Sequence, residues 1–183
     1  ENLEVDPMVT QEMKKDLVRL ERITDRFSKI GSESKLQDSN LSQTIEKNLD
    51  YLRARLSEKV ELVFKTNLGG EFIVSHNASL MDWVVENLCK NAVDAMQGVG
   101  RLEVTLKNDK SNIVLDFKDS GKGIASKDQK AIFEPGFSTK KRGWGLGLAL
   151  VKRIIEEHHK GKVFVASSKS GQGTTFRILL PIH

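Results

Sequence analysis

The chain lacks the features that hold a small secreted fold together or anchor a chain in a bilayer. Its 183 residues include one cysteine, Cys89, which excludes an internal disulfide and fits a reducing compartment. No run approaches the roughly 18 uninterrupted apolar residues of a membrane-spanning helix. The opening residues, ENLEVDPMV, do not have the pattern of a signal peptide. We therefore expect a cytoplasmic chain without direct membrane contact, and leave open an anchor upstream in a longer parent protein.

Concentrated charge is also missing. Lys and Arg number 29 against 25 Asp and Glu, for a net charge of +4 and a pI near 9.1. A nucleic-acid-binding face needs basic residues gathered together with aromatics between them, whereas here the two signs are interspersed along the chain. We expect no nucleic-acid partner. The hydrophobic share of 38% is typical of one globular domain of ordinary size.

The familiar phosphate-binding signatures are absent. The pairs Gly121-Lys122 and Gly161-Lys162 lack the upstream glycine and the following hydroxyl of a Walker loop. The glycines 143, 145 and 147 have the wrong third spacing for a dinucleotide fingerprint and follow a basic loop rather than a strand. The stretch DFKDSG is not a DFG motif. These observations exclude the common nucleotide-binding folds.

An amphipathic pattern opens the chain, and it predicts a helix from residue 10 to residue 30, ended by Gly31. Its apolar positions recur at spacings of three and four: Met13, Leu17, Leu20, Ile23, Phe27 and Ile30. A helix with this stripe needs an apolar partner surface. Two interpretations remain open, packing on the chain's own core or a seam in a helical bundle with another chain.

The rest of the sequence alternates helix and strand patterns. After a polar linker at 31–39, Asn40 and Gln43 resemble a capping box that opens a helix, and Asn77 or Ser79 opens another. Tight turns join several of the strands, including one after glycines 69–70. The pattern predicts an α+β fold, an antiparallel-rich sheet with helices on one face. The predicted helices are 41–56, 80–96, 127–133 and 146–159 (closed by Gly161), and the predicted strands are 60–66, 69–75, 101–108, 112–119, 161–168 and 173–182.

The stretch from residue 136 to residue 150, GFSTKKRGWGLGLAL, places glycines and cations at the start of a helix. Glycine lets backbone N–H groups approach a ligand closely, and a helix N-terminus favours an anion. The alternative is an ordinary surface loop followed by a capped helix. On this stretch alone the two interpretations are equally good.

Together with four other stretches, this one resembles the GHKL ATPases, the superfamily of histidine kinases, type II topoisomerases, a heat-shock chaperone and a mismatch-repair protein. The similarity covers residues 40 to 183, and the form FEPGFSTK narrows it to sensor histidine kinases. The five motifs, in the family's order, are ENLCKNAVDA, DSGKGI, IFEPGFSTK, GWGLGLALVKRIIEEH and GQGTTFRILLP. The resemblance implies a two-layer sandwich of a mixed, mostly antiparallel sheet packed on helices, with ATP and Mg²⁺ as ligands.

In the first motif the resemblance assigns ATP binding to Asn87, Asn91 and Asp94, which share one face of a helix. Asn91 is the implied Mg²⁺ ligand, since an amide oxygen suits that ion. Asn87 is the implied catalytic position, where the family's hydrolases carry a glutamate as general base. Asn cannot take a proton, so the chain should retain ATP for transfer. Glu86 points about 100° away and should not substitute.

At the base end, the resemblance implies that Asp119 reads the adenine amine, that Gly121 and Gly123 make the turn beneath the ring, and that Thr174 reaches adenine through water. A lid would run from Ile124 to Gly143. Phe133 and Phe137 would anchor the lid, more loosely than usual because Gly136 replaces a second phenylalanine. Lys140 is the implied catalytic cation on the phosphates. The remaining implied nucleotide contacts are Ile124, Phe133, Ser138, Thr139, Lys140, Gly143, Gly145, Leu146, Gly147 and Leu148.

The resemblance divides the chain into residues 1–35, a helix of a dimerisation and phosphotransfer bundle, and residues 36–183, the catalytic domain. It implies a homodimer in the parent protein and a response-regulator partner. None of His76, His158, His159 and His183 has the surroundings of a phospho-acceptor, so the acceptor is expected outside this chain. Two rivals are a serine kinase of the anti-sigma type and a non-catalytic regulator that uses the ATP site only to bind partners.

Overall fold

A computed structural model describes residues 35–66, 73–109, 111–138 and 145–182, with Thr10, Gln11, Met13 and Leu17 from the first part of the chain. The chain forms two compact units, Glu1–Ser34 and Lys35–His183. The four described residues of the first unit are helical. Most of the predicted helix 10–30 lies outside the described residues. Its packing, and the assignment of the two parts to a bundle and a catalytic domain, stay predictions.

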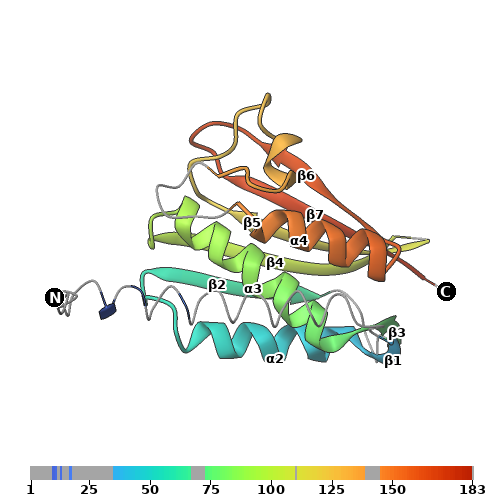
Figure 1. Cartoon of the computed structure of the whole chain (residues 1–183). Helices are drawn as coiled ribbons and strands as arrows, with labels where there is room; N and C mark the ends of the chain where they lie inside the picture. The colour runs from blue at the N-terminus through green and yellow to red at the C-terminus, as the bar shows by residue number, and fades with distance from the viewer. Residues whose placement is uncertain are drawn as a thin grey trace, which may run out of the picture. The chain divides into compact units, whose positions relative to one another are not determined.

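The second unit is built on a five-stranded sheet (Figure 1). Its strand order is β2-β4-β5-β7-β6. The edge pair β2–β4 is parallel, and the other pairs are antiparallel, which confirms a mixed, mostly antiparallel sheet. The strands are β2 (Val60–Thr66), β4 (Gly100–Asp109), β5 (Asn112–Asp119), β6 (Lys162–Ser168) and β7 (Thr174–Pro181).

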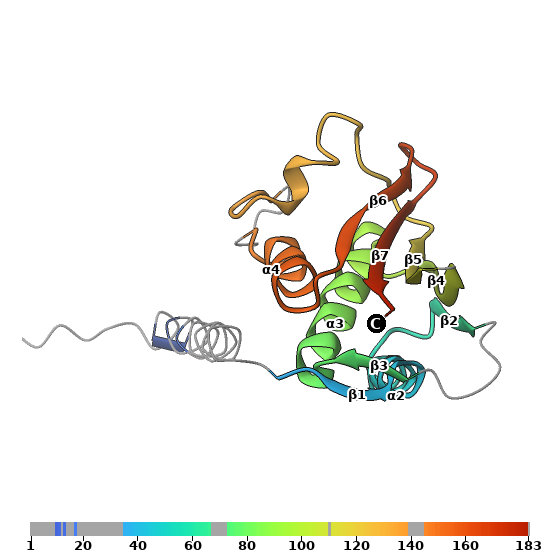
Figure 2. The same cartoon turned by 90° about the vertical axis from the view of Figure 1, so that its right-hand side faces the viewer.

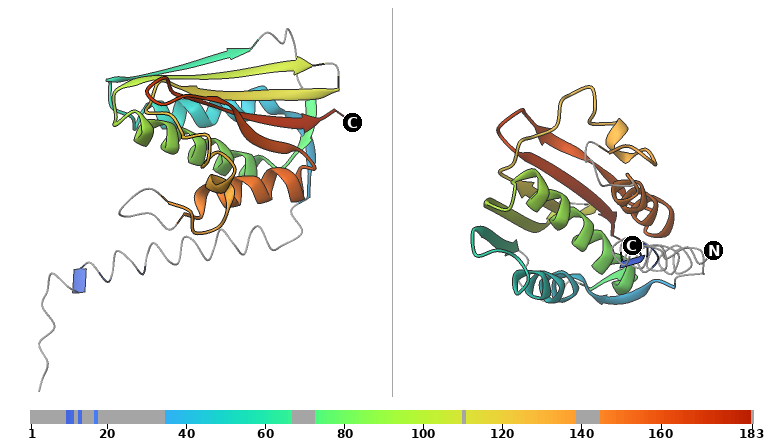
Figure 3. Two further views of the ribbon diagram at one scale, coloured as in Figure 1. Left: turned by 90° about the horizontal axis from the view of Figure 1, so that it is seen from above. Right: turned by 60° about the vertical axis from the view of Figure 1, so that its left-hand side comes forward.

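Three helices form the second layer: α2 (Leu41–Arg53), α3 (Ala78–Ala95) and α4 (Gly147–Arg153). They lie on one side of the sheet, as two perpendicular views show (Figures 2 and 3). Alternate residues of β4, Leu102, Val104 and Leu106, are fully buried because successive side chains of a strand point to opposite faces. This arrangement confirms the α+β sandwich. None of the described helices is long and apolar enough to span a membrane.

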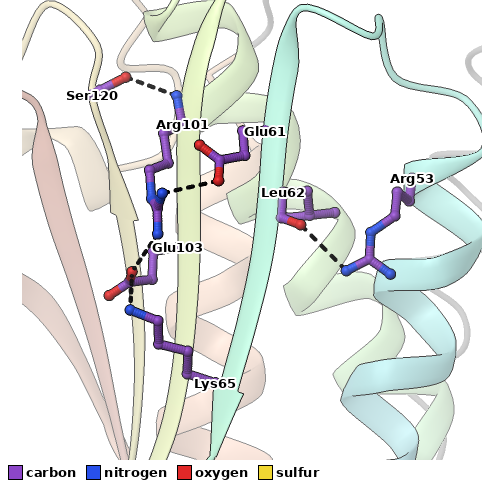
Figure 4. A network of polar contacts seen from close by, with 7 residues as sticks. All are labelled: Arg53, Glu61, Leu62, Lys65, Arg101, Glu103 and Ser120. Atoms are coloured by element: carbon purple, nitrogen blue, oxygen red, sulfur yellow. Dashed lines mark hydrogen bonds and ion pairs between the residues drawn. The ribbon is translucent and has the colours of Figure 1, made fainter.

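The opposite face of the sheet is polar. Lys65 Nζ lies 2.7 Å from Glu103 Oε2, and Arg101 joins Glu61 across β2 and β4 at 2.9 Å (Figure 4). The hydrogen bond from Lys65 lowers the pKa of the Glu103 carboxyl. Ion pairs this exposed contribute about 0–1 kcal/mol each. The network therefore makes this face polar but adds little to the stability of the fold.

Both predicted helix caps are confirmed, but the linker before the first is not. The Asn40 side chain accepts from Gln43 N at 3.2 Å, and the Asn77 side chain accepts from Leu80 N at 3.0 Å. The prediction of a linker throughout 31–39 is wrong at its end, because β1 (Gln37–Asn40) pairs antiparallel with β3 (Ile73–His76). A polar four-residue strand has no apolar alternation to reveal it. β3 therefore pairs with β1 rather than with β2.

Two predicted helices differ in detail. Residues 127–133 form turns and a short 3-10 helix, η1 (Ala131–Phe133), because only Ile132 and Phe133 there are buried. The helix 146–159 begins as α4 and continues as a π-helix, η2 (Ile154–His158). The left-handed residue at its end is Lys160, with φ 53°. A Cβ on Gly161 would lie 2.3 Å from Leu179 O, so glycine is required there for space.

His159 follows η2 as its C-cap and is buried, at 4% exposed. Its Nε2 accepts the backbone N–H of Asn77 at 3.1 Å, and its Nδ1 donates to Ile154 O at 2.9 Å. Burial lowers the pKa of His159. His159 is therefore a neutral link between η2 and the cap of α3.

This link makes the fold sensitive to acid. The folded protein holds His159 neutral, while the unfolded chain takes up a proton near pH 6.5. Protonation thus favours the unfolded state, and the free energy of unfolding falls as the pH drops through that value. We expect His159→Gln to cost about 1–3 kcal/mol at neutral pH but to lose less stability on acidification than the wild type, measured by urea unfolding. His158→Gln is the matched control, and equal acid sensitivity of the His159 variant and the wild type would contradict this.

Candidate functional site

One face of α3 contacts two segments that are distant in sequence. Asn87, Asn91 and Ala95 share this face because they are spaced by four residues. Asn87 Nδ2 donates to Trp83 O at 2.9 Å, and Asn87 Oδ1 lies 2.9 Å from the position of a Cβ on Gly147, the first residue of α4. The part of this face around Asn87, nearer the N-terminus of α3, therefore contacts the start of α4.

The other end of the same face contacts the loop after β5. A Cβ on Gly121 would lie 2.7 Å from the carbonyl C and O atoms of Ala95, and Lys122 N donates to Ala95 O at 3.1 Å. Asn91 lies between the two contacts. Asn87 and Asn91 are half-buried, and Asp94, in the last turn of α3, is exposed.

Asp119, the last residue of β5, is the buried carboxylate of the site, at 4% exposed. Its Oδ1 accepts from Gly121 N at 2.8 Å and from Thr174 N at 3.3 Å. Burial raises its pKa, although these two backbone hydrogen bonds oppose the shift. The donors Gly121 N and Thr174 N both bind Oδ1, and the second carboxylate oxygen, Oδ2, is of a type that can accept from a ligand.

Two glycines with positive φ close the loop against the β6–β7 turn. A Cβ on Gly123 (φ 74°) would lie 2.0 Å from Lys169 O, and a Cβ on Gly173 (φ 83°) would lie 1.9 Å from Asp119 O. No side chain fits at either distance. The backbones of residues 119–123 and 168–174 are therefore in direct contact beside Asp119.

The β6–β7 turn offers a matched pair of glycines for testing this contact. Gly171 (φ 73°) and Gly173 (φ 83°) share the same strained conformation, but a Cβ on Gly171 meets nothing within 4 Å. We expect Gly171→Ala to lower the free energy of unfolding by about 1–2 kcal/mol, because alanine is strained at a positive φ. Gly173→Ala should lower it by about 1–3 kcal/mol more, because its Cβ would also overlap Asp119 O. Thermal unfolding measures both, and equal losses would argue against the close approach.

Ser168, at the end of β6, was not among the residues predicted from sequence. Its Oγ accepts from Ile124 N at 2.8 Å, donates to Gly173 O at 3.1 Å and lies 2.9 Å from Thr174 Oγ1. Thr174 is buried at 3% exposed and pairs with Asp119 across β5 and β7. Only the register of β6 against β7 brings Ser168 beside Thr174, and no motif spacing reveals that register.

Gly136, within the predicted lid, contacts Gly145, which lies just beyond it. Gly136 N donates to Gly145 O at 3.1 Å, and a Cβ on Gly145 (φ 66°) would lie 2.4 Å from Gly136 C. Phe133 is buried and packs edge-on against Phe176, with ring centroids 6.2 Å apart. Phe137 is half-buried.

The structure thus places Asp119, Gly121, Gly123, Ile124 and Thr174 together beside the C-terminal end of α3, and Asn87 beside the start of α4. Leu146, Gly147 and Leu148 at that start are half-buried, and Ser138 is exposed. Thr139, Lys140 and Gly143 lie outside the described residues, so their predicted contacts stay predictions. Within the described ranges, no three His, Cys, Asp or Glu side chains gather as a metal site.

Comparisons with known proteins place this site in context. The family described as histidine kinase-, DNA gyrase B- and HSP90-like ATPases matches residues 76–183. Sensor histidine kinase ZraS of Escherichia coli strain K12 is 33% identical over 177 residues, covering 78% of this chain and 38% of that protein. The chain therefore spans less than two-fifths of the length of this relative.

Two solved structures are similar in fold. The catalytic domain of histidine kinase ThkA superposes with a TM-score of 0.72 at 25% identity, covering 80% of this chain and 95% of that chain. ThkA in complex with response regulator protein TrrA gives a TM-score of 0.75 at 22% identity, covering 99% of this chain and 52% of that chain. At this identity the second likeness concerns the fold alone.

Proposed function

Since the chain belongs to the family of histidine kinase-, DNA gyrase B- and HSP90-like ATPases, we propose that it is the part of a sensor histidine kinase that binds Mg·ATP and transfers the γ-phosphoryl group to a histidine on another segment. The observation that carries this proposal is the contact of one face of α3 with two other motifs. Asn87 lies against Gly147, and Ala95 lies against Gly121, in the same loop as Asp119, which contacts Gly173 of a further motif.

The described groups suit adenine at the base end. A purine that carries an amine offers N–H donors, and the buried Asp119 carboxylate can offer Oδ2 as an acceptor. Gly121 and Gly123 keep the adjacent loop free of side chains, since a Cβ at either would overlap neighbouring backbone. The adenine ring would lie over this loop with its amine toward Asp119 and Thr174.

The triphosphate would extend toward the start of α4. A helix N-terminus with glycine at 145 and 147 offers unpaired backbone N–H groups to an anion. Asn91 would hold Mg²⁺ together with phosphate oxygens, and Mg²⁺ when bound supplies charge neutralisation for phosphoryl transfer. We propose that Lys140 approaches the phosphates from the lid. Asn87 cannot activate water, so hydrolysis would be slow and transfer favoured.

The wider assembly follows from the same proposal. ThkA is a histidine kinase solved with a response regulator, and we propose that a response-regulator aspartate receives the phosphoryl group from the histidine. The parent protein would dimerise through the helix at residues 10–30. The acceptor histidine would lie on a bundle helix that this chain does not include.

Phosphotransfer to a separate acceptor tests the proposal. The chain is incubated with γ-labelled ATP, Mg²⁺ and a purified bundle hairpin that carries an acceptor histidine. We expect label on the hairpin that acid removes and base does not, as for phosphohistidine, and none when the acceptor is changed to Gln. Acid-stable label on serine would favour the anti-sigma type of kinase. ATP binding without transfer to any hairpin would favour the non-catalytic regulator.

A further inference from the structure

The three hydrogen bonds of Ser168 occupy the one donor and the two acceptor positions of its hydroxyl. A serine hydroxyl donates one hydrogen bond and accepts two. Ser168 accepts from Ile124 N and donates to Gly173 O, a carbonyl that has no proton to give. The remaining position of Ser168 is an acceptor. The 2.9 Å contact with Thr174 is therefore a hydrogen bond that Thr174 donates.

We propose that Ser168 is a positioning residue that orients the proton of Thr174 and thereby makes the site select a purine with a 6-amino group over a purine with a 6-oxo group. The inference rests on the proposed nucleotide function. With its proton given to Ser168, the Thr174 hydroxyl offers only lone pairs to a ligand. The neighbouring Asp119 carboxylate also offers only an acceptor. The Thr174 hydroxyl and the Asp119 carboxylate then both require a hydrogen-bond donor from the ligand.

Purines differ in the group that they present there. Adenine has an amine donor at position 6, whereas guanine has a carbonyl acceptor in the same place, and hypoxanthine shares that carbonyl. The 6-oxo group of such a purine would face two acceptors without a proton between them. A site built to pair one polar group rejects a ligand that leaves it unpaired. Without Ser168, the Thr174 hydroxyl is free to rotate and donate to a 6-oxo group.

The test compares ATP with inosine triphosphate, in which the 6-amino group is replaced by a 6-oxo group. Affinities of wild type and Ser168→Ala for both nucleotides with Mg²⁺ are measured by calorimetry. We expect the ratio of the two affinities to fall by about tenfold in Ser168→Ala, because inosine triphosphate binding is retained or improved while ATP binding weakens. Ser168→Thr keeps the hydroxyl and should restore the ratio, and Ser170→Ala, in the exposed turn, is the matched control.

Each other outcome is decisive. An unchanged ratio in folded Ser168→Ala, or an equal loss for both nucleotides, would show that Ser168 only supports the loop. If Ser168→Ala does not fold, Thr174→Val is measured instead, and an unchanged ratio there overturns the inference. A wild type that binds both nucleotides equally also overturns it while leaving the proposed function intact. A wild type that binds neither contradicts the proposed function itself.

Discussion

Asp119→Asn is expected to weaken ATP binding by about 10- to 100-fold, because a hydrogen bond to a charged acceptor contributes about 1.5–3 kcal/mol. The substitution replaces the acceptor Oδ2 by an amide that donates, and a donor then faces the adenine amine. Calorimetry with ATP and with inosine triphosphate measures the effect. The loss should be large for ATP and small for the 6-oxo nucleotide, and equal losses would argue against a contact through the base.

The same variant should not destabilise the unliganded protein. Burial raises the pKa of Asp119, so the folded state disfavours its charged form, and the carboxylate lowers the free energy of unfolding at neutral pH. That cost disappears as the pH falls through the raised pKa. Asn removes the charge and keeps an oxygen for the N–H groups of Gly121 and Thr174. We expect its advantage over wild type at neutral pH to shrink on acidification. Asp109→Asn, at the exposed far end of β4, is the control, and a clearly lower melting temperature of Asp119→Asn would contradict this.

Asn91→Ala is expected to raise the Kd for Mg·ATP by about 100-fold or more, since even indirect support of a metal ligand contributes about 10- to 100-fold. Asn91 lies on α3 between the contact of Asn87 with α4 and the contact of Ala95 with Gly121. A ligand that extends from the β5 loop to α4 passes this position. The measurement is calorimetry with and without Mg²⁺.

Comparing ATP affinity with and without Mg²⁺ distinguishes a metal ligand from a residue that contacts the nucleotide itself. If Asn91 holds the ion, the loss should be much smaller for ATP in the presence of a chelator. Lys90→Ala is the matched control on the same helix, because Lys90 is exposed and pairs only with Glu86 among the described contacts, at 2.6 Å. A folded Asn91→Ala protein with wild-type affinity for Mg·ATP would remove Asn91 from the site.

Local patterns in the sequence predicted most of the elements. The alternation of Val60–Thr66 gave the bounds of β2, and the polar residues Asn40 and Asn77 marked two helix starts that the structure confirms. The motif order predicted that α3, Asp119 and Thr174 meet. These features depend on residues close in sequence or on a pattern shared by a whole family.

What sequence did not reveal depends on non-local pairing. β1 is too short and polar to show alternation, and its partner β3 lies more than thirty residues away. β2 pairs parallel with β4, and α4 continues as the π-helix η2. Both features depend on packing between distant segments, which a short stretch of sequence does not show. The contact of Ser168 with Thr174 depends on the register of β6 against β7, which the sequence does not show.

A nucleotide titration followed by amide NMR shows whether α3, the β5 loop, the β6–β7 turn and the start of α4 form one ATP site. A non-hydrolysable ATP analogue is added with Mg²⁺ to the labelled chain. We expect the amides of Gly121, Ile124, Gly147 and Thr174 to shift along a single binding curve, while the amide of Glu103 on the opposite face of the sheet does not move. Amides of these segments that stay still at saturating nucleotide, or that follow different curves, would show that they do not form one site.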